Sequence, residues 1–163
     1  MKVTYSDLKN KRVFISGGGS GIGATIVEYF CEQKSEVYFI DIDLKSSNKL
    51  IKKIKKKGFR VPKFIECNIL DVKKLQNIIK DIISKKGAIH CLINSAANDD
   101  RHTTEQVDEK YWENRMGINL KHYFFAAQAV VKGMKKIKSG SIVNLSSVSW
   151  VLGEGDKVVY ETA

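Results

Sequence analysis

The stretch that decides the fold of this 163-residue chain is Ser16-Gly-Gly-Gly-Ser-Gly-Ile-Gly23. It follows a short β-branched and aromatic run, Arg12–Ser16, which is typical of a buried strand. It precedes Ile22–Lys34, where apolar residues recur with helical period. A glycine-rich turn between a strand and a helix exposes backbone N–H groups at the helix start, and these groups attract phosphate. The stretch therefore predicts a nucleotide phosphate site, although glycines also form ordinary turns.

The glycine spacing decides which of the known phosphate-binding motifs the turn matches. A P-loop is excluded because Ala24 stands where that motif needs lysine. The strict six-residue dinucleotide fingerprint also fails, since it would need glycine or alanine at Ile22. The pattern that fits is Gly-x-x-x-Gly-x-Gly. We expect the cofactor to be held by Gly17, Gly19, Ser20, Gly21, Ile22 and Gly23.

Strand and helix patterns alternate outward from this turn. The predicted further strands are Val37–Ile40, Phe64–Ile69, Ile89–Ile93 and Ser141–Leu145. The predicted further helices are Leu44–Lys57, Val72–Lys86 and Trp112–Ile137, the last as one long or two broken helices, and a loop leads on to Tyr160. This alternation predicts an α/β fold, a Rossmann-like, doubly wound parallel sheet with helices on both faces. Its first five strands are expected in the order 3-2-1-4-5.

Asp41 closes the second predicted strand, 24 residues after Gly17. A carboxylate at about this distance can hydrogen-bond the adenosine ribose, and it would repel a 2′-phosphate. No Lys or Arg lies within Gly17–Gly23 to hold such a phosphate. We therefore expect NAD rather than NADP. Asp43 is an alternative for the ribose ligand, and a helix-capping role is the alternative for Asp41.

Composition and residue spacing argue against several other classes of function. Apolar residues make up 43% and charged residues 28%, and the net charge is +10. The lysines occur late in helical patterns without interleaved aromatic residues, so we expect a solvated surface rather than nucleic-acid binding. Three cysteines without a C-x-x-C pair favour a reducing compartment, and the histidines lack metal-ligand spacing. With neither signal peptide nor membrane span predicted, the expected location is cytoplasmic.

At this point the chain resembles the classical short-chain dehydrogenase/reductase family. Beside the glycine turn, the resemblance rests on Asn94-Ser-Ala-Ala97, Asn119, Ser141–Ser147 and Tyr160. Tyr160 begins a Tyr-x-x-x-Lys motif, and it lies 13 residues after Ser147, which favours Ser147 over Ser146.

The resemblance assigns roles to these residues. It implies that Tyr160 is the general base, that Ser147 holds the substrate oxygen and that Asn119 belongs to the proton relay. It also implies cofactor contacts at Asn68, Ile69, Asn94 and Ala96. Three residues depart from the family pattern. Asn68 stands where the family has an aspartate, and Ser95 and Ala97 differ from the family's motif after the fourth strand.

A narrower similarity is to the NAD-dependent sugar 1-dehydrogenases, especially the D-xylose (aldose) 1-dehydrogenases, which oxidise an aldose to a lactone. It rests on Asn98–His102, Ser149-Trp150 and Val159–Ala163. It implies substrate contacts at Asn98, Arg101, His102, Ser149 and Trp150. The substrate is then an aldose or another secondary alcohol. A polar surface loop is the alternative for Asn98–His102.

The family pattern continues beyond Ala163, where its lysine would follow. We therefore expect residues 1–163 to be the N-terminal part of a single Rossmann-fold domain, truncated at the C-terminus and inactive by itself. Family members form homo-oligomers, so the resemblance implies a dimer or tetramer. The competing hypothesis is a non-catalytic NAD-binding regulatory module.

Overall fold

A computed structural model describes residues 3–153 and 155–163. Its core is one parallel sheet in the order β3-β2-β1-β4-β5, which confirms the predicted Rossmann-like topology. The strands are β1 (Arg12–Ser16), β2 (Glu36–Asp41), β3 (Lys63–Glu66), β4 (Cys91–Asn94) and β5 (Ser141–Asn144). The order reverses at β1, and ligands of open α/β sheets bind at such a reversal.

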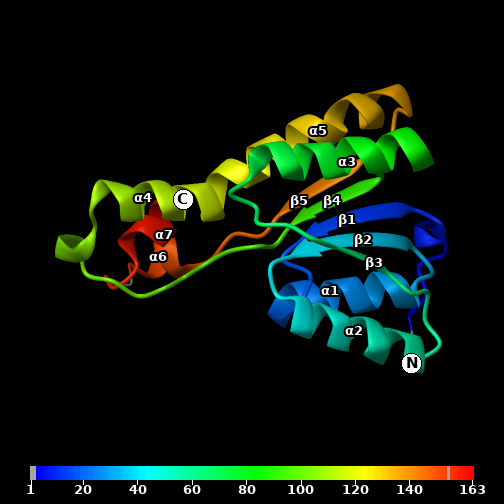
Figure 1. Ribbon diagram of the computed structural model, residues 1–163, viewed down its shortest axis with the longest axis horizontal. Coiled ribbons are helices and arrows are strands. Elements are labelled where there is room, and N and C mark those ends of the chain that lie inside the picture. Colours follow the sequence, from blue (N-terminus) through cyan, green and yellow to red (C-terminus); the bar gives the residue numbers. More distant parts are fainter. Residues whose placement is uncertain (1–2, 154) are drawn as a thin grey trace.

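Helices cover both faces of the sheet, as Figure 1 shows. The helices α1 (Gly21–Glu32) and α2 (Leu44–Lys56) pack on one face, while α3 (Val72–Lys86) and α5 (His122–Lys136) pack on the other. Side chains alternate along β1, so Val13 and Ile15 join the first core and Phe14 joins the second. All three are fully buried, as a parallel sheet between two helix layers requires.

Two helices begin and end where their local sequence dictates. The side chains of Asp43 and Asp71 accept hydrogen bonds from the N–H groups of Ser46 and Lys74, at 2.9 Å each, and so cap α2 and α3. Gly58 and Gly87 follow the ends of these helices with φ of 70° and 89°, a region that favours glycine.

The predicted helix Trp112–Ile137 is one continuous helix with a π-helical turn inside it, and it begins at Glu109, three residues earlier than expected. Its first part is α4 (Glu109–Met116), which Asp108 caps by accepting from the Tyr111 N–H at 2.7 Å. A π-helical turn, Gly117–Lys121, then joins α4 to α5. Such turns are often found at functional sites.

The segment after β5 departs from the sequence prediction of a loop. It contains two short helices, α6 (Ser149–Leu152) and α7 (Val158–Thr162). Helices of four and five residues are too short to leave a periodic apolar pattern. Together with α4 they form a lobe that projects beyond the carboxyl ends of the strands (Figure 1).

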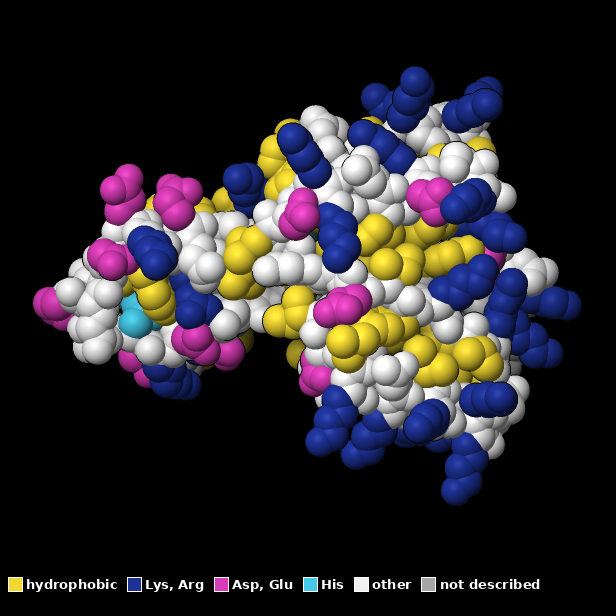
Figure 2. Space-filling view, in the orientation of Figure 1, with side chains coloured by type: hydrophobic (Ala, Val, Ile, Leu, Met, Phe, Trp, Pro, Cys, Tyr) yellow, Lys and Arg dark blue, Asp and Glu magenta, His cyan; other side chains and the backbone are white. Residues whose placement is uncertain are grey.

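The surface carries its positive charges mainly over the sheet-and-helix body (Figure 2). Acidic side chains are more frequent around the lobe in the same view. In the described part of the chain, no helix is both long enough and apolar enough to cross a membrane.

Candidate functional site

The glycine turn after β1 is held open by the strand next to it. The N–H groups of Gly17 and Gly18 donate to the carbonyl of Ile40 at 2.9 and 3.2 Å. Gly17 has φ of 69°, and a Cβ there would lie 2.6 Å from Cα of Ala96. A Cβ on Gly23 would overlap the carbonyl oxygen of Gly17. Both positions therefore require glycine for steric reasons.

The start of α1 faces a cleft with its polar backbone exposed. The hydroxyl of Ser20, the N-cap residue, makes no capping hydrogen bond within the described chain. Gly21 is exposed, and a Cβ on it would meet no described atom within 4 Å. The first N–H groups of the helix are thus oriented as an anion requires, with the positive end of the helix dipole behind them.

Asp41 joins the glycine turn to the end of β2. One carboxylate oxygen accepts from the N–H of Gly19 at 2.8 Å, and the other accepts from the N–H of Asp43 at 2.9 Å. Asp43 also lines the cleft, but its carboxylate caps α2. Of the two candidates for the ribose ligand, Asp41 is therefore the one fixed against the phosphate-binding turn.

One cleft of about 690 Å³ runs along the carboxyl edge of the sheet. It brings together most of the residues predicted to hold the cofactor and one predicted catalytic residue. Of the predicted set, it is lined by Gly17, Ser20, Gly21, Ile22, Gly23, Asp41, Asn68, Ile69, Ala96, Asn98 and Tyr160. Gly19 and Asn94 lie behind its wall, where Gly19 holds Asp41 and the side-chain amide of Asn94 donates to the Asn144 side chain at 2.8 Å.

The side of the cleft at the end of β3 is less polar than the family pattern suggests. The side-chain oxygen of Asn68 accepts from the N–H of Leu70 at 3.0 Å, so it shapes the turn before α3. Cys67 is a lining residue that sequence reasoning missed. Its burial raises the pKa of the thiol, so it acts as an apolar wall at neutral pH.

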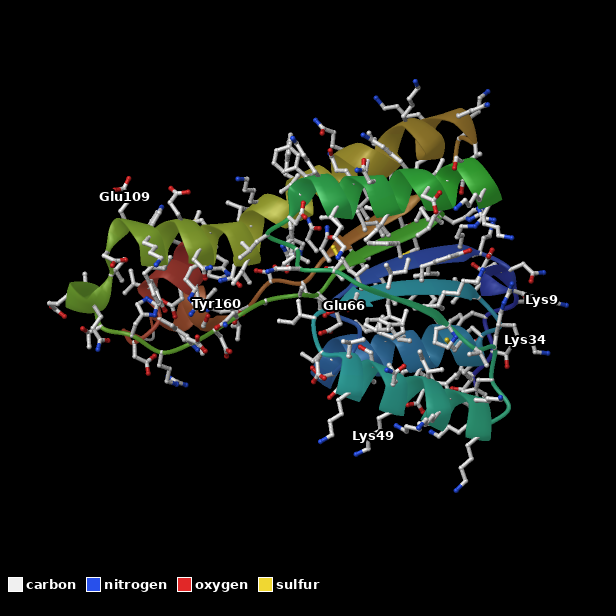
Figure 3. All side chains as sticks on the ribbon, in the orientation of Figure 1. Lys9, Lys34, Lys49, Glu66, Glu109 and Tyr160 are labelled. Carbon is white, nitrogen blue, oxygen red and sulfur yellow. The ribbon has the colours of Figure 1, made fainter. Side chains whose placement is uncertain are left out.

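A second cavity of about 240 Å³ adjoins the cleft. The two share five lining residues, Ala97, Tyr123, Leu145, Ser146 and Tyr160. The predicted residues Asn119, Ser147, Ser149 and Trp150 line this second cavity. Figure 3 shows Tyr160 in the lobe, with Glu66 on the sheet side of the molecule.

The hydroxyl of Ser147 is anchored locally. It donates to Oγ of Ser149 at 3.0 Å and accepts from the N–H of Ser149 at 3.2 Å. Ser146 is more exposed and lines both cavities, so both serines share the second cavity with Tyr160. Trp150 is 64% exposed and offers a broad apolar face to the second cavity.

Asn119 sits in the π-helical turn and is 7% exposed. Its side-chain oxygen accepts from the N–H of Asn98 at 2.8 Å, and its amide donates back to the carbonyl of Asn98 at 3.0 Å. The pair fixes the segment after β4 against the helix. Asn119 therefore has a structural role in addition to its place on the cavity wall.

Tyr123 is a further residue that the sequence did not single out. Its hydroxyl donates to the carbonyl of Leu145 at 3.1 Å, across from α5 to the end of β5. Burial raises the pKa of Tyr123 to about 12, with a smaller contribution from the neighbouring Tyr160. Tyr123 therefore stays protonated. Nothing in the local pattern of an amphipathic helix marks such a residue.

The buried residue His122 lies behind the part of the cleft wall that Ser95 and Ala96 form. Nε2 of His122 lies 3.3 Å from the hydroxyl of Ser16, which accepts from the N–H groups of Ser95 and Ala96 at 3.2 and 3.3 Å. Because that hydroxyl already accepts two hydrogen bonds, its own proton is free for His122. Burial lowers the pKa of His122 to about 4, so the ring is neutral at pH 7.

Two predicted substrate residues are not brought to either cavity. Arg101 forms an ion pair with Asp156, and His102 is only 7% exposed. Neither side chain lines the cleft or the second cavity. The structure thus places Asn98 on the wall of the cleft and Ser149 and Trp150 on the wall of the second cavity, and it uses Arg101 and His102 elsewhere.

The remaining feature is how metal-ligating side chains are distributed in the described part of the chain. Among the residues that the structure describes, no group of three or more His, Cys, Asp or Glu side chains could hold a metal ion.

Comparison with known proteins gives consistent similarities. Residues 11–163 match the family described as short chain dehydrogenase. The chain is 41% identical over 160 residues to D-xylose 1-dehydrogenase of Caulobacter vibrioides, and 38% identical over 159 residues to probable galactose dehydrogenase GalD of Rhizobium meliloti. These alignments cover 98% of this chain and 62% of each relative, so the chain spans less than two thirds of their length.

A solved structure with ligands is similar as well. It is a gluconate 5-dehydrogenase from Burkholderia cenocepacia in complex with NADP and tartrate. The TM-score is 0.83 at 25% identity, over 94% of this chain and 60% of that one.

Proposed function

Since the chain belongs to the short-chain dehydrogenase family, we propose that it carries the cofactor cleft and the proton-abstracting residues of an NAD-dependent aldose 1-dehydrogenase. The product is a lactone, formed when the anomeric carbon of the sugar is oxidised. The observation that carries the proposal is the common cleft of about 690 Å³, which the glycine turn, Asp41 and Tyr160 all line.

The residues of the cleft fit a dinucleotide. The uncapped start of α1 and the open face of Gly21 suit the pyrophosphate, and Asp41 suits the adenosine ribose. The backbone around Asn68 and Ile69, with Cys67, suits the adenine, and Ala96 and the end of β4 suit the nicotinamide side. When bound, the nicotinamide supplies the acceptor for the hydride that leaves the sugar C1.

NAD is favoured over NADP by charge. Asp41 is fixed at the cleft by two backbone N–H groups, and its negative charge would repel a 2′-phosphate. Because a similar solved structure holds NADP, the cofactor preference is tested with both dinucleotides.

The chain's own residues handle the proton. Tyr160 takes the proton of the sugar hydroxyl as general base, while the serine hydroxyl at position 147 holds the same oxygen. A tyrosine phenol is protonated at neutral pH, so a nearby positive charge must favour the phenolate. Asn119 holds the segment after β4 and supplies a polar wall for the proton relay.

The aldose is favoured by the second cavity and by the relatives. Asn119, Ser147 and Ser149 offer hydrogen bonds to hydroxyl groups, and Trp150 offers a face for the sugar ring. The 41% and 38% identical relatives are named for xylose and galactose. A secondary alcohol other than a sugar is the alternative substrate, and a non-catalytic NAD-binding module is the alternative function.

We propose that residues 1–163 are the N-terminal part of a single Rossmann-fold domain and turn over little substrate without a C-terminal part. The 62% coverage of the relatives supports this division. We further propose a homo-oligomer in the cytoplasm. The three cysteines are all unpaired, as a reducing compartment favours.

The function is tested by following NADH formation at 340 nm with a panel of aldoses, gluconate and a simple secondary alcohol, each with NAD and NADP. The protein for this assay contains residues 1–163 and a C-terminal part of the relatives' length. Oxidation of an aldose with NAD, lost in Tyr160→Phe, supports the proposal. Activity that survives in Tyr160→Phe, or none with any aldose, contradicts it.

A further inference from the structure

We propose that His102 is a positioning residue that holds Tyr160 in place through a hydrogen bond to the backbone of α7. The proposal rests on the proposed function only in taking Tyr160 as the general base. It gives His102 a role that differs from the substrate contact implied by resemblance.

The contacts of His102 converge on the residue before Tyr160. Nε2 accepts a hydrogen bond from the N–H of Val159 at 3.2 Å. The N–H of His102 itself donates to the carbonyl of Asp156 at 2.7 Å. The imidazole therefore fixes the start of α7, and the main chain of His102 fixes the approach to it. Val159 is 1% exposed, so its N–H has no access to water as a substitute partner.

This geometry selects one form of the ring. Because Val159 is a donor, Nε2 must carry no proton, and the proton of the neutral imidazole is on Nδ1. Nδ1 lies 2.9 Å from the carbonyl oxygen of Asp100 and 2.9 Å from the hydroxyl of Tyr111. Both can accept the proton, so the Nδ1 side holds the tautomer that Val159 needs.

Protonation of the ring would oppose the Val159 contact. An imidazolium presents N–H at both nitrogens, so two donors would face one another at 3.2 Å. The groups around the ring are Tyr111, whose ring lies 4.9 Å away, and Arg115, which stacks on Tyr111 and pairs with Asp100 at 2.6 Å. On the α7 side lie Lys157 and the Arg101–Asp156 ion pair.

The segment that carries His102 is fixed at its other end by Asn119. Asn98 exchanges two backbone hydrogen bonds with the Asn119 side chain, and four residues later His102 binds Val159. A single short segment thus connects the wall of the cofactor cleft to the helix of Tyr160. A shift of about 1 Å in a catalytic group can cost as much as 100-fold in rate, so such a brace has a catalytic consequence.

The test compares two substitutions of the same side chain in the 163-residue chain. His102→Gln keeps an acceptor near the position of Nε2 and cannot be protonated, whereas His102→Leu removes the acceptor. His90→Gln is the matched control, since His90 accepts from the N–H of Arg12 at the opposite end of the sheet. The readout is hydrogen exchange at the amides of Val159 and Tyr160 at pH 7.5, corrected for intrinsic rates.

We expect His102→Leu to accelerate exchange at Val159 about tenfold at pH 7.5, because a buried donor loses its partner. His102→Gln and His90→Gln should stay within about threefold of the wild type. Equal protection of Val159 in wild type and His102→Leu would overturn the proposal.

Where His102→Leu does not fold, His102→Asn takes its place with the same expected result, because its shorter side chain keeps its acceptor away from the Val159 N–H. In the active protein described above, His102→Leu should lower kcat about tenfold or more and leave KM for NAD within about twofold, with recovery in His102→Gln. An unchanged kcat would also overturn the proposal. Binding of NAD, measured separately, reports on the cleft alone, so a failure there leaves the exchange result intact.

Discussion

At the scale of single residues, the carboxylate of Asp41 links the phosphate-binding turn to the choice of cofactor. It receives two backbone N–H groups, from Gly19 and Asp43, and it stands at the wall of the cleft. Asp41→Asn keeps the shape and one acceptor but removes the charge. We expect it to weaken NAD binding about tenfold and to reduce the preference over NADP, because a charge-assisted hydrogen bond becomes a neutral one.

Isothermal titration calorimetry of the variant with NAD and with NADP measures both the affinity for NAD and the preference over NADP. Asp43→Asn is the matched control, since its carboxylate caps α2 and should influence stability more than cofactor choice. A loss of preference in Asp43→Asn but not in Asp41→Asn would assign the ribose contact to Asp43 instead of Asp41.

Gly23 tests the steric basis of the turn. A Cβ at this position overlaps the carbonyl oxygen of Gly17, so Gly23→Ala must displace either the helix or the turn. We expect a loss of about 1–3 kcal/mol in the free energy of unfolding and little remaining NAD affinity. Gly155→Ala, where a Cβ meets no described atom within 4 Å, serves as control. Urea unfolding and titration with NAD measure the two quantities, and wild-type values in Gly23→Ala would refute this account of the turn.

His122 predicts how stability depends on pH. Burial lowers its pKa from 6.5 to about 4 in the folded chain. Between these values the unfolded chain takes up a proton that the folded chain does not, so the free energy of unfolding falls as pH decreases through this range. From pH 7 to pH 5 the expected loss from this residue is about 2 kcal/mol.

Urea unfolding of the wild type and of His122→Gln at both pH values isolates this contribution. Acidic groups whose pKa is lowered in the folded chain, such as Glu36 and Asp156, also contribute to the free energy of unfolding. Their contribution is lost mainly at lower pH, and it is the same in both proteins. A wild-type decrease no larger than that of the variant would show that His122 is not buried as a neutral ring.

At the scale of elements, the sequence predicts what periodicity and turn chemistry determine. The five strands, the helices α1, α2 and α3, and the helix that runs from α4 to the end of α5 appear within a few residues of their expected bounds. Gly58 and Gly87 end their helices as turn chemistry requires. The short helices α6 and α7 were missed because neither completes two turns, and their packing in the lobe is determined by distant contacts such as His102 with Val159.

The same distinction applies to the site. The glycines, Asp41 and Tyr160 follow from local motifs and converge on one cleft. Tyr123 and Cys67 line that cleft without any local signal, because their positions depend on how α5 and β3 pack. Arg101 and His102 show the converse case, in which polar residues of a plausible substrate loop are used to hold the lobe.

The strand β5 is the exposed edge of the sheet in the described chain. It pairs with β4 alone, and Ile142 and Val143 are 41% and 45% exposed. Unpaired edges of this kind favour association between chains. We expect the 163-residue chain to self-associate as its concentration rises, and Val143→Lys to reduce that association. Sedimentation velocity measures it, with Val61→Lys, at another exposed valine, as control. Association that is the same in both variants would place the contact elsewhere.

At the scale of the whole molecule, the cleft lies where the sheet body meets the lobe. The body supplies the glycine turn and Asp41, and the lobe supplies Tyr160. The two parts are joined by the segments after β4 and β5 and by the helix that runs from α4 through the π-helical turn into α5. Cofactor binding on the body and proton abstraction in the lobe therefore depend on each other's geometry. The residues behind the cleft, His122 and Asn119 among them, hold this arrangement.

The most direct test of the central claim is isothermal titration of the purified 163-residue chain with NAD and, separately, with NADP. The account predicts saturable binding of NAD to one site per chain and clearly weaker binding of NADP. Heat from neither dinucleotide, or tighter binding of NADP than of NAD, would contradict the assignment of the glycine turn and Asp41.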